Sequence, residues 1–196
     1  MAELSRNTCH VELVETSKRL KMEAKLQKIK AFVFDVDGVL TDGGILSTPE
    51  GDLLRVFDSK DAFALRMVYM KGYHVGVITG GVSESIRLRF KTCGVPMENI
   101  YLGSRAKIED LEDFCRRYDL KAEEIMYFGD DLPDIPVMLA CGCGVAPSDA
   151  VEEAKAAADI VSSRPGGKGV ARELIEMVLK MHGKWELDVH DYKSKF

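Results

Sequence analysis

From residue 30 onward, short apolar segments alternate with longer amphipathic ones. The apolar segments are rich in branched residues and cover residues 31–36, 74–79, 99–103, 124–130, 142–146 and 158–162. The amphipathic segments have apolar residues at helical spacing and cover residues 61–72, 83–94, 107–120, 134–142, 150–158 and 169–183. Regular alternation of strand and helix is typical of a parallel sheet with helices on both faces. The pattern therefore predicts an α/β fold with a three-layer, doubly wound sheet.

Residues 45–57 interrupt this alternation. Two short apolar stretches flank Pro49, Glu50 and Gly51, which predicts a β-hairpin that projects after the first strand. The segments between the strands hold only this hairpin and single helices, so we expect a Rossmann-like domain without a cap domain. We expect this domain to span residues 30–183. Residues 1–29 would form an extension, helical or loosely held from residue 11, and residues 184–196 a tail.

Composition narrows the class of protein. The chain has 196 residues and a formal net charge of −5, and its basic residues are scattered among acidic ones, which argues against nucleic-acid binding. No apolar segment is long enough to span a bilayer. Five cysteines, an odd number with no secretory signal before them, indicate a cytoplasmic protein with reduced thiols. We expect Cys141 and Cys143 to be buried rather than to bind a metal.

Polar residues gather where the predicted strands end. These residues are Asp35 and Asp37, Thr79 with Gly80 and Gly81, Lys107, and Asp130 with Asp131 and Asp134. Ligands of open α/β sheets bind beyond the carboxyl ends of the strands, so we expect these side chains to converge on one crevice. Each cluster alone would be weak evidence for a functional site, since such residues also occur in turns and helix caps. Their occurrence together, each at a strand end, favours a catalytic site.

The chemistry of these residue types indicates phosphoryl transfer. Mg²⁺ prefers carboxylate and phosphate oxygens, which Asp35 and a substrate would supply together with Asp130. With the metal reducing the repulsion between anions, Asp35 could attack phosphorus as a nucleophile. Asp37 would serve as general acid and base. Thr79 and the backbone at Gly80 would bind the phosphate, and Lys107 would balance its charge.

The four motifs resemble those of the haloacid dehalogenase-like phosphohydrolases. They are DVDGVLTD (residues 35–42), VITGG (residues 77–81), Lys107 and GDDLPD (residues 129–134), in that order. The resemblance implies an aspartyl-phosphate mechanism with Asp35 as nucleophile and Asp37 as acid/base. It also implies that Mg²⁺ is held by Asp35, the backbone carbonyl of Asp37, and Asp130. Asp131 and Asp134 would support the metal site or contact the substrate.

Three further segments are similar to those of the 3-deoxy-D-manno-octulosonate 8-phosphate phosphatases. They are DGVLTDG, the hairpin, and GGKGVARELIEMVLKMHGKW at residues 166–185. This resemblance implies a capless homotetramer that acts on a sugar phosphate in lipopolysaccharide synthesis. Neighbouring subunits would complete each site, with Gly166–Gly169 as the segment that reaches across.

The expected sugar contacts depart from that family. Residues 60–64 read Lys-Asp-Ala-Phe-Ala where the family has Arg-Asp-Gly-Tyr-Gly, and Gly81 stands where an arginine is usual. The resemblance still implies substrate contacts from Lys60, Asp61, Arg66 and Arg89. Because of the departures, a phosphatase for the nine-carbon 2-keto-3-deoxynononate 9-phosphate remains a close alternative.

Two readings of another class are also open. Receiver domains of signalling proteins place aspartates, a threonine and a lysine on a similar sheet and hold a phosphoryl group as a switch. Asp37 argues against this reading, because a general acid/base speeds the turnover that a switch must avoid. A silent oligomerisation module is the other alternative, and the intact set of catalytic side chains argues against it.

Overall fold

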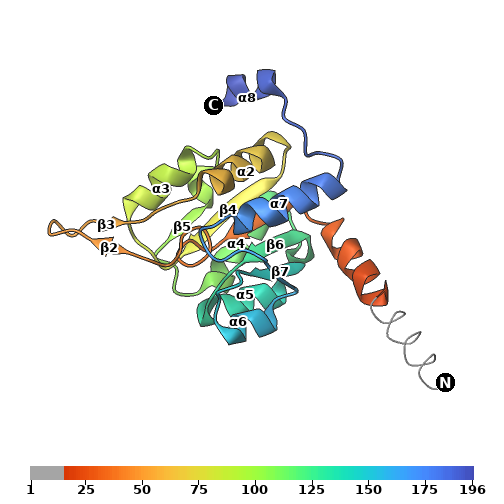
Figure 1. The fold of residues 1–196 in the computed structure, drawn as a ribbon, viewed down its shortest axis with the longest axis horizontal. Coiled ribbons are helices and arrows are strands. Elements are labelled where there is room, and N and C mark those ends of the chain that lie inside the picture. Colours follow the sequence, from red (N-terminus) through yellow and green to blue (C-terminus); the bar gives the residue numbers. More distant parts are fainter. Residues whose placement is uncertain (1–15) are drawn as a thin grey trace.

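Six parallel strands form the central sheet of the structure, a computed structural model that describes residues 16–196 (Figure 1). The strands are β1 (Ala31–Phe34), β4 (His74–Thr79), β5 (Ile100–Leu102), β6 (Ile125–Phe128), β7 (Cys143–Ala146) and β8 (Ile160–Val161). They lie in the order β5-β4-β1-β6-β7-β8. After β1 the chain adds β4 and β5 on one side and then β6, β7 and β8 on the other. The predicted sheet is confirmed. The side on which the chain adds strands switches at β1, and ligands bind at such a switch point in folds of this type.

Helices cover both faces of the sheet, as predicted. One face carries α2 (Ser59–Met70), α3 (Glu84–Lys91) and α7 (Val170–Met181), and the other carries α4 (Lys107–Tyr118), α5 (Ile135–Ala140) and α6 (Glu152–Ala157). Side chains of β1 alternate between the two cores: Phe32 and Phe34 face the first, and Ala31 and Val33 the second. All four are fully buried, which explains why β1 is continuously apolar in sequence.

Short elements complete the connections. The 3-10 helices are η1 (Met97–Asn99), η2 (Ala122–Glu124) and η3 (Leu132–Asp134). Cys143 opens β7 and is buried, as is Cys141, so the expected burial of this pair is confirmed. Within residues 16–196, no helix is both long and apolar enough to cross a membrane.

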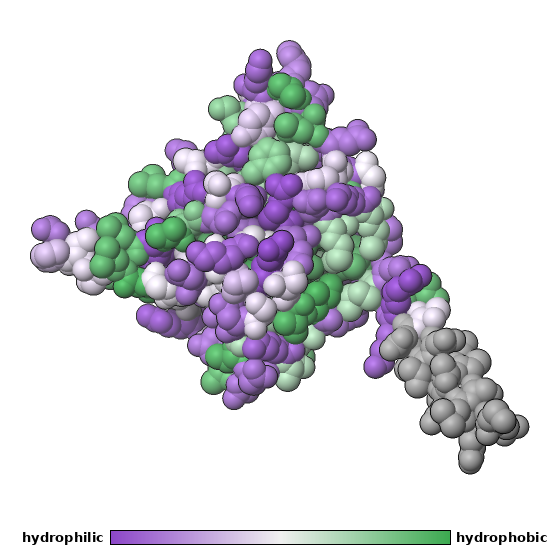
Figure 2. Space-filling model, in the orientation of Figure 1, coloured by the Kyte–Doolittle hydropathy of each residue, from purple (hydrophilic) through white to green (hydrophobic). Residues whose placement is uncertain are grey.

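The predicted hairpin is present and projects from the body of the molecule (Figure 1). Its strands are β2 (Leu46–Ser47) and β3 (Leu53–Leu54), which pair in antiparallel fashion. Apolar side chains are exposed along it (Figure 2), namely Ile45, Leu46, Leu54 and Val56. No larger insertion separates the strands of the described chain, so the expected absence of a cap domain agrees with the structure.

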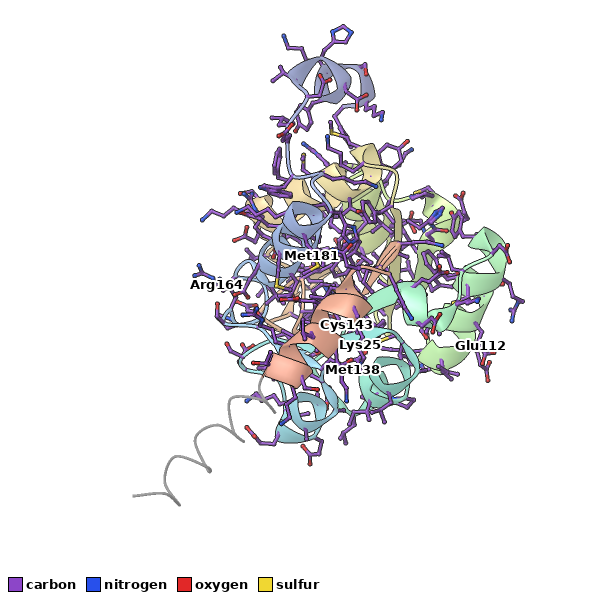
Figure 3. The ribbon with its side chains drawn as sticks, turned by 90° about the vertical axis from the view of Figure 1, so that its right-hand side faces the viewer. Lys25, Glu112, Met138, Cys143, Arg164 and Met181 are labelled. Carbon is purple, nitrogen blue, oxygen red and sulfur yellow. The ribbon has the colours of Figure 1, made fainter. Side chains whose placement is uncertain are left out.

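The segment before β1 is tied to the domain. Residues 16–26 form a helix, and Leu26 and Ile29 are buried in the core that also holds Phe32. Lys25 of this helix (Figure 3) donates a 2.6 Å hydrogen bond to Asp159, just before β8. The start of the expected helix, residues 11–15, lies outside the described residues, as do Cys9 and the rest of residues 1–15. The division into extension, domain and tail stays a prediction.

The tail folds back on the domain through α8 (Val189–Lys195). The Arg66 side chain on α2 donates to the Tyr192 hydroxyl at 2.8 Å and to the Thr92 carbonyl at 3.1 Å. Its guanidinium also lies over the ring of Phe196, 4.9 Å from the centroid. Arg66 therefore fastens the tail to α2 in this chain.

Candidate active site

A cleft opens at the carboxyl ends of β1, β4, β5 and β6. Its lining comprises Asp35, Asp37, Thr79, Gly80, Gly81, Ser104, Arg105, Lys107, Asp130, Asp131, Pro133 and Asp134. Four sequence segments, far apart along the chain, thus meet at one edge of the sheet. The expectation that the strand-end residues would converge on one crevice agrees with this geometry.

Lys107 is the cation at the floor of the cleft. Its ammonium lies 3.0 Å from a carboxylate oxygen of Asp35 and 2.7 Å from one of Asp134. The side chain is 7 % exposed, so the two ion pairs are shielded from solvent. Burial lowers the pKa of Lys107, but the two carboxylates outweigh burial and raise it above its ordinary value. The lysine is therefore firmly charged.

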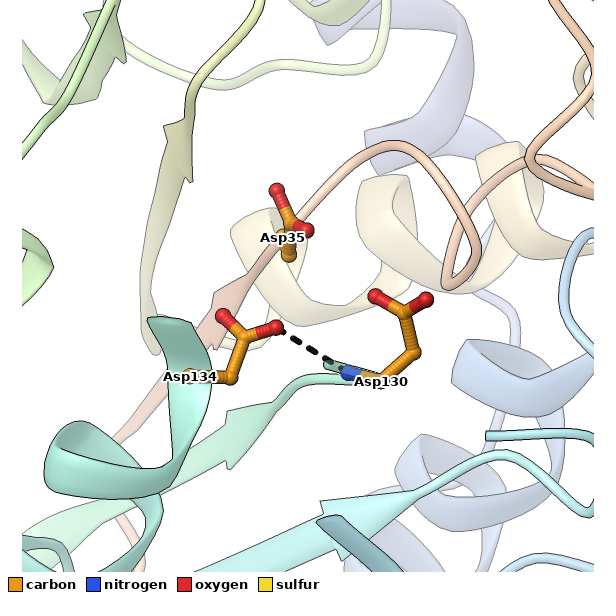
Figure 4. Close-up of side chains that lie close together, drawn as sticks. All are labelled: Asp35, Asp130 and Asp134. Carbon is orange, nitrogen blue, oxygen red and sulfur yellow. Dashed lines mark hydrogen bonds between the residues drawn. The ribbon is translucent and has the colours of Figure 1, made fainter. Parts of the chain in front are cut away.

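Asp134 organises the site from beneath. It is fully buried, and one of its oxygens accepts from Lys107 and, at 2.6 Å, from the Tyr127 hydroxyl. The other oxygen accepts from the backbone N–H of Asp130 at 3.1 Å (Figure 4). It also accepts from the backbone N–H of Asp131 at 3.3 Å. These bonds fix the loop after β6. The placement argues against the substrate contact expected for Asp134, because both of its oxygens are already used.

Asp130 can approach the loop that follows Asp35 because this loop contains Gly38, and the Asp130 carboxylate packs where a side chain at position 38 would lie. A Cβ on Gly38 would lie 2.0 Å from the Asp130 carboxylate, and Gly38 has a φ of 87°. Only glycine adopts this conformation readily and leaves this space. One oxygen each of Asp35, Asp130 and Asp134 lies within 4.8 Å of the others.

Two of these carboxylates fit a metal ion. The Oδ1 atoms of Asp35 and Asp130 are buried and have no hydrogen-bond partner among the described residues. Unsatisfied buried oxygens of this kind are costly unless a ligand completes them. A hard divalent cation that binds carboxylate oxygens would do so. Asp134 is a poorer ligand, because its oxygens are occupied.

The pKa values of the acidic groups reflect the crowding of charge. Burial raises the pKa of Asp35 to about 6, against the opposing effect of Lys107. Burial, and next the charge of Asp35, raise the pKa of Asp130 to about 7. The buried Tyr127 hydroxyl, beside Asp134 and Asp35, has a pKa well above its ordinary value. One cation at the floor of the cleft thus leaves negative charge to be neutralised.

Asp37 is held by an arginine that the sequence patterns did not single out. Arg55 follows β3, and its guanidinium donates from Nε and Nη2 to the two Asp37 oxygens, at 2.6 and 2.9 Å. The Thr41 hydroxyl lies 3.5 Å from one of these oxygens. Asp37 is still a quarter exposed and lines the cleft.

Hydroxyl and backbone groups also line the cleft. Thr79, at the end of β4, is buried, and its hydroxyl oxygen accepts from the Gly81 N–H at 3.2 Å. Its proton is therefore free to point to a ligand. Gly80 lies beside it in the cleft, and Ser104 and Arg105 follow β5 at the same edge. These groups suit phosphate oxygens.

The expected sugar contacts lie elsewhere in this chain, and for Asp61 the structure argues against the expectation. Asp61 is 2 % exposed and accepts from the N–H groups of Gly169 and Arg172, so it caps the start of α7. Lys60 faces a separate hollow that Lys168 and Arg172 also line. Arg66 binds the tail, and Arg89 lies over the ring of Phe57. None of these four residues lines the Asp35 cleft within the described chain.

The glycine-rich segment before α7 packs on its own subunit. A Cβ on Gly166 would lie 2.0 Å from the carbonyl of Gly38, and the Gly167 N–H donates to the Val39 carbonyl at 2.9 Å. These contacts hold the loop that carries Asp37. Lys168 is exposed. Gly166 and Gly167, which begin the segment expected to reach a neighbour, thus pack against their own chain.

Sequence patterns did not single out Arg105, which lines the cleft, or Tyr127 and Arg55, which bind residues that line it. Arg105 stands two places before Lys107 at the same strand end, so proximity to a motif was an available signal. Tyr127 is a tyrosine inside an apolar strand, where a buried hydroxyl needs a partner. Arg55 had no local signal, because it meets Asp37 only when the hairpin folds back.

Comparison with known proteins gives a consistent result. Residues 85–174 match the family model of the haloacid dehalogenase-like hydrolases. A 3-deoxy-D-manno-octulosonate 8-phosphate phosphatase of Haemophilus influenzae is 36 % identical over 163 residues, covering 83 % of this chain and 89 % of the relative. Its counterpart in Escherichia coli K12 is 34 % identical over 161 residues, covering 82 % and 85 % of the two chains.

Solved structures show the same fold. A haloacid dehalogenase superfamily (subfamily III A) hydrolase from Legionella pneumophila superposes with a TM-score of 0.86 at 32 % identity, covering 93 % of this chain and 99 % of that one. The 3-deoxy-D-manno-octulosonate 8-phosphate phosphatase from Moraxella catarrhalis, in complex with a magnesium ion, a phosphate ion and KDO, gives 0.78 at 31 % identity. That comparison covers 82 % of this chain and 91 % of the Moraxella chain.

Proposed function

Because the chain belongs to the haloacid dehalogenase-like hydrolases and is a phosphoric monoester hydrolase, we propose that it is a Mg²⁺-dependent 3-deoxy-D-manno-octulosonate 8-phosphate phosphatase. One observation carries the proposal: the unpartnered, buried oxygens of Asp35 and Asp130 lie at the strand ends beside Lys107. The identity to phosphatases of that name extends over four fifths of the chain, which supports the substrate.

In the first half of the reaction, a carboxylate oxygen of Asp35 attacks the phosphorus of the substrate. The bond from Asp35 to phosphorus forms as the bond from phosphorus to the sugar oxygen breaks. Asp37 gives its proton to the departing oxygen, so that the sugar leaves as an alcohol. The phosphoryl group is now on Asp35.

In the second half, water attacks the same phosphorus. Asp37 takes a proton from this water, the bond from phosphorus to Asp35 breaks, and inorganic phosphate leaves. Asp37 is again protonated and Asp35 again a carboxylate, so the cycle closes without a further reactant. Positioned acid/base groups of this type contribute about 10²- to 10⁴-fold to the rate.

The remaining groups bind and neutralise the phosphoryl oxygens. Lys107 offers a fixed positive charge next to the nucleophile, and Thr79 donates its hydroxyl. Mg²⁺, when bound, would reduce the repulsion between Asp35 and the phosphate dianion. Asp35, Asp130 and the backbone carbonyl of Asp37 would hold it, and Asp131 lies at the same loop to support the shell. Arg105 at the exposed rim would suit the carboxylate of a sugar acid.

Assembly into a homotetramer through the hairpins is part of the proposal. Leu46 and Val56 are 67 % and 74 % exposed on the hairpin, which is an unfavourable exposure for a free arm. A neighbour docked there would bring further residues to the open cleft. We expect Leu46→Asp to lower the sedimentation coefficient, with Glu50→Asp at the hairpin turn as control. A wild-type chain that sediments as a monomer with full substrate specificity would refute this part.

The substrate assignment is tested with a panel of phosphate esters. Catalytic efficiency is measured for the eight-carbon and nine-carbon keto-sugar acid phosphates and for neutral sugar phosphates, with Mg²⁺ and with EDTA. We expect the eight-carbon acid to be the best substrate and EDTA to abolish turnover. A preference for the nine-carbon acid phosphate would make it the substrate in place of the eight-carbon one. A preference for neutral sugar phosphates would refute the assignment to sugar acids. A cytoplasmic location and a role in lipopolysaccharide synthesis stay predictions.

A further inference from the structure

We propose that Arg55 is a positioning residue for the reaction, which orients the Asp37 carboxylate toward the leaving group and the attacking water. We further propose that Gly81 lacks a side chain in order to leave space for this arginine. The proposal rests on the proposed function, because it assumes that Asp37 transfers protons. It concerns a contact between the hairpin and the catalytic loop.

The contact between Arg55 and Asp37 has the geometry of a rigid fork. Two parallel hydrogen bonds of 2.6 and 2.9 Å join Nε and Nη2 to the two carboxylate oxygens. Bidentate pairs of this kind fix the plane of the carboxylate as well as its position. A carboxylate has about four acceptor positions, so Oδ2, which among the described residues accepts from Nη2 alone, keeps one for a proton in the cleft. The arginine therefore orients Asp37 without occupying it fully.

The arginine is itself immobilised. Its side chain is 2 % exposed, and the third nitrogen, Nη1, donates to the carbonyl of Leu53 at 3.2 Å. Leu53 belongs to β3, so the base of the hairpin fixes the guanidinium. Without Arg55, the Asp37 side chain would keep only the 3.5 Å contact with Thr41. That contact is too long to hold a carboxylate in one rotamer.

Gly81 provides the space that Arg55 fills. A Cβ at this position would lie 3.2 Å from Nη2 of Arg55 and 2.8 Å from the Ile86 side chain. Any larger residue at position 81 would therefore require the guanidinium of Arg55 or the end of the Ile86 side chain to move. The loop after β4 and the hairpin thus meet at the arginine, next to the phosphate-binding Thr79.

The consequence for the reaction is specific to proton transfer. The departing sugar oxygen needs a proton when its bond to phosphorus breaks, and the attacking water must lose one. A displacement of about 1 Å in such a group costs about 10²-fold in rate. A nitrophenolate leaving group needs no proton, so only the water step should suffer with an aryl phosphate.

The test compares Arg55→Met, Arg55→Lys and wild type on the best sugar phosphate and on p-nitrophenyl phosphate. Arg116→Met, at the far end of α4 from Lys107, is the matched control because it also removes an arginine that pairs with an aspartate. We expect Arg55→Met to lower kcat on the sugar phosphate about 10²-fold with little change in KM. Arg55→Lys should restore part of the rate, since lysine offers a point charge rather than a fork.

Rapid mixing with p-nitrophenyl phosphate separates orientation from general damage. We expect Arg55→Met to release one nitrophenolate per site in a burst and then to turn over slowly, because Asp35 is still phosphorylated while water is not activated. The proposal would be overturned if Arg55→Met had the kcat of wild type. It would also be overturned if the variant lost both the burst and the later turnover. Should Arg55→Met fail to fold, Gly81→Ala and Arg55→Lys decide by the same two readouts. A wild type without phosphatase activity would instead refute the proposed function.

Discussion

The crowded carboxylates of the cleft predict that metal and pH act together on stability. Without metal, burial and mutual repulsion raise the pKa of Asp35 to about 6 and that of Asp130 to about 7. Their ordinary value is 3.8. A raised pKa in the folded state means that folding favours the protonated acid. As pH rises from about 4 to about 7, the unfolded chain ionises first, so the metal-free protein should become less stable.

The magnitude follows from the shifts. Each unit of pKa corresponds to about 1.4 kcal/mol, so the rise of the Asp130 pKa from 3.8 to about 7 would give roughly 4 kcal/mol before any allowance for solvent. Solvent reaches Asp130, and its shift is coupled to that of Asp35. We therefore expect the two carboxylates together to lower the free energy of unfolding by about 3 kcal/mol. For a chain of this size this equals a decrease of roughly 6–12 °C in the melting temperature. Bound Mg²⁺ at a hundred times its Kd should restore about 2.7 kcal/mol.

Thermal unfolding is measured from pH 4.5 to 7.5, in EDTA and in MgCl₂, for wild type and for Asp130→Asn. The variant cannot ionise at position 130, so its metal-free melting temperature should vary less with pH and should respond little to Mg²⁺. Asp52→Asn, in the exposed hairpin turn, is the matched control and should behave as wild type. Other groups titrate in this range, so the difference between Asp130→Asn and wild type is the quantity to compare.

Two outcomes would refute this reasoning. If metal-free wild type and Asp130→Asn show the same pH dependence, the Asp130 carboxylate is not strained in the folded protein. If Mg²⁺ stabilises Asp130→Asn as much as wild type, the metal does not bind between these carboxylates.

Two further substitutions test the support of the site. Tyr127→Phe removes the hydroxyl that donates to buried Asp134 and should lower the free energy of unfolding by about 1.5–3 kcal/mol in urea titrations; an unchanged value would mean that this bond adds nothing. Asp61→Ala removes the cap of α7 and should cost about 0.5–2 kcal/mol in the same assay while KM stays constant. A large rise in KM with unchanged stability would return Asp61 to the substrate site.

Much of the fold could be predicted from the sequence because each element has a strong local signal. All six strands of the sheet are short apolar segments followed by polar, glycine or proline residues, and their helices have one apolar face. Parallel strands place their carboxyl ends at one edge of the sheet, so the sequence was enough to predict that Asp35, Thr79, Lys107 and Asp130 lie together. Their roles in the reaction stay proposals.

The rest could not be predicted because it depends on packing between distant segments. Asp61 and Asp134 are acidic residues near motifs, and sequence does not distinguish an acid that faces a ligand from one that accepts backbone N–H groups in the core. Arg55 and Asp37 are 18 residues apart and meet only through the path of the hairpin. Arg66 has its partner in the tail, 126 residues away.

Trapping of the phosphorylated enzyme tests the central claim most directly. The Asp37→Asn variant is mixed with substrate and Mg²⁺, quenched in acid within one turnover, digested and sequenced by mass spectrometry. The account predicts a phosphoryl group on Asp35, and no phosphorylated peptide when Asp35 is also changed to Asn. A phosphoryl group on another residue, or wild-type phosphate release by Asp35→Asn, would contradict it.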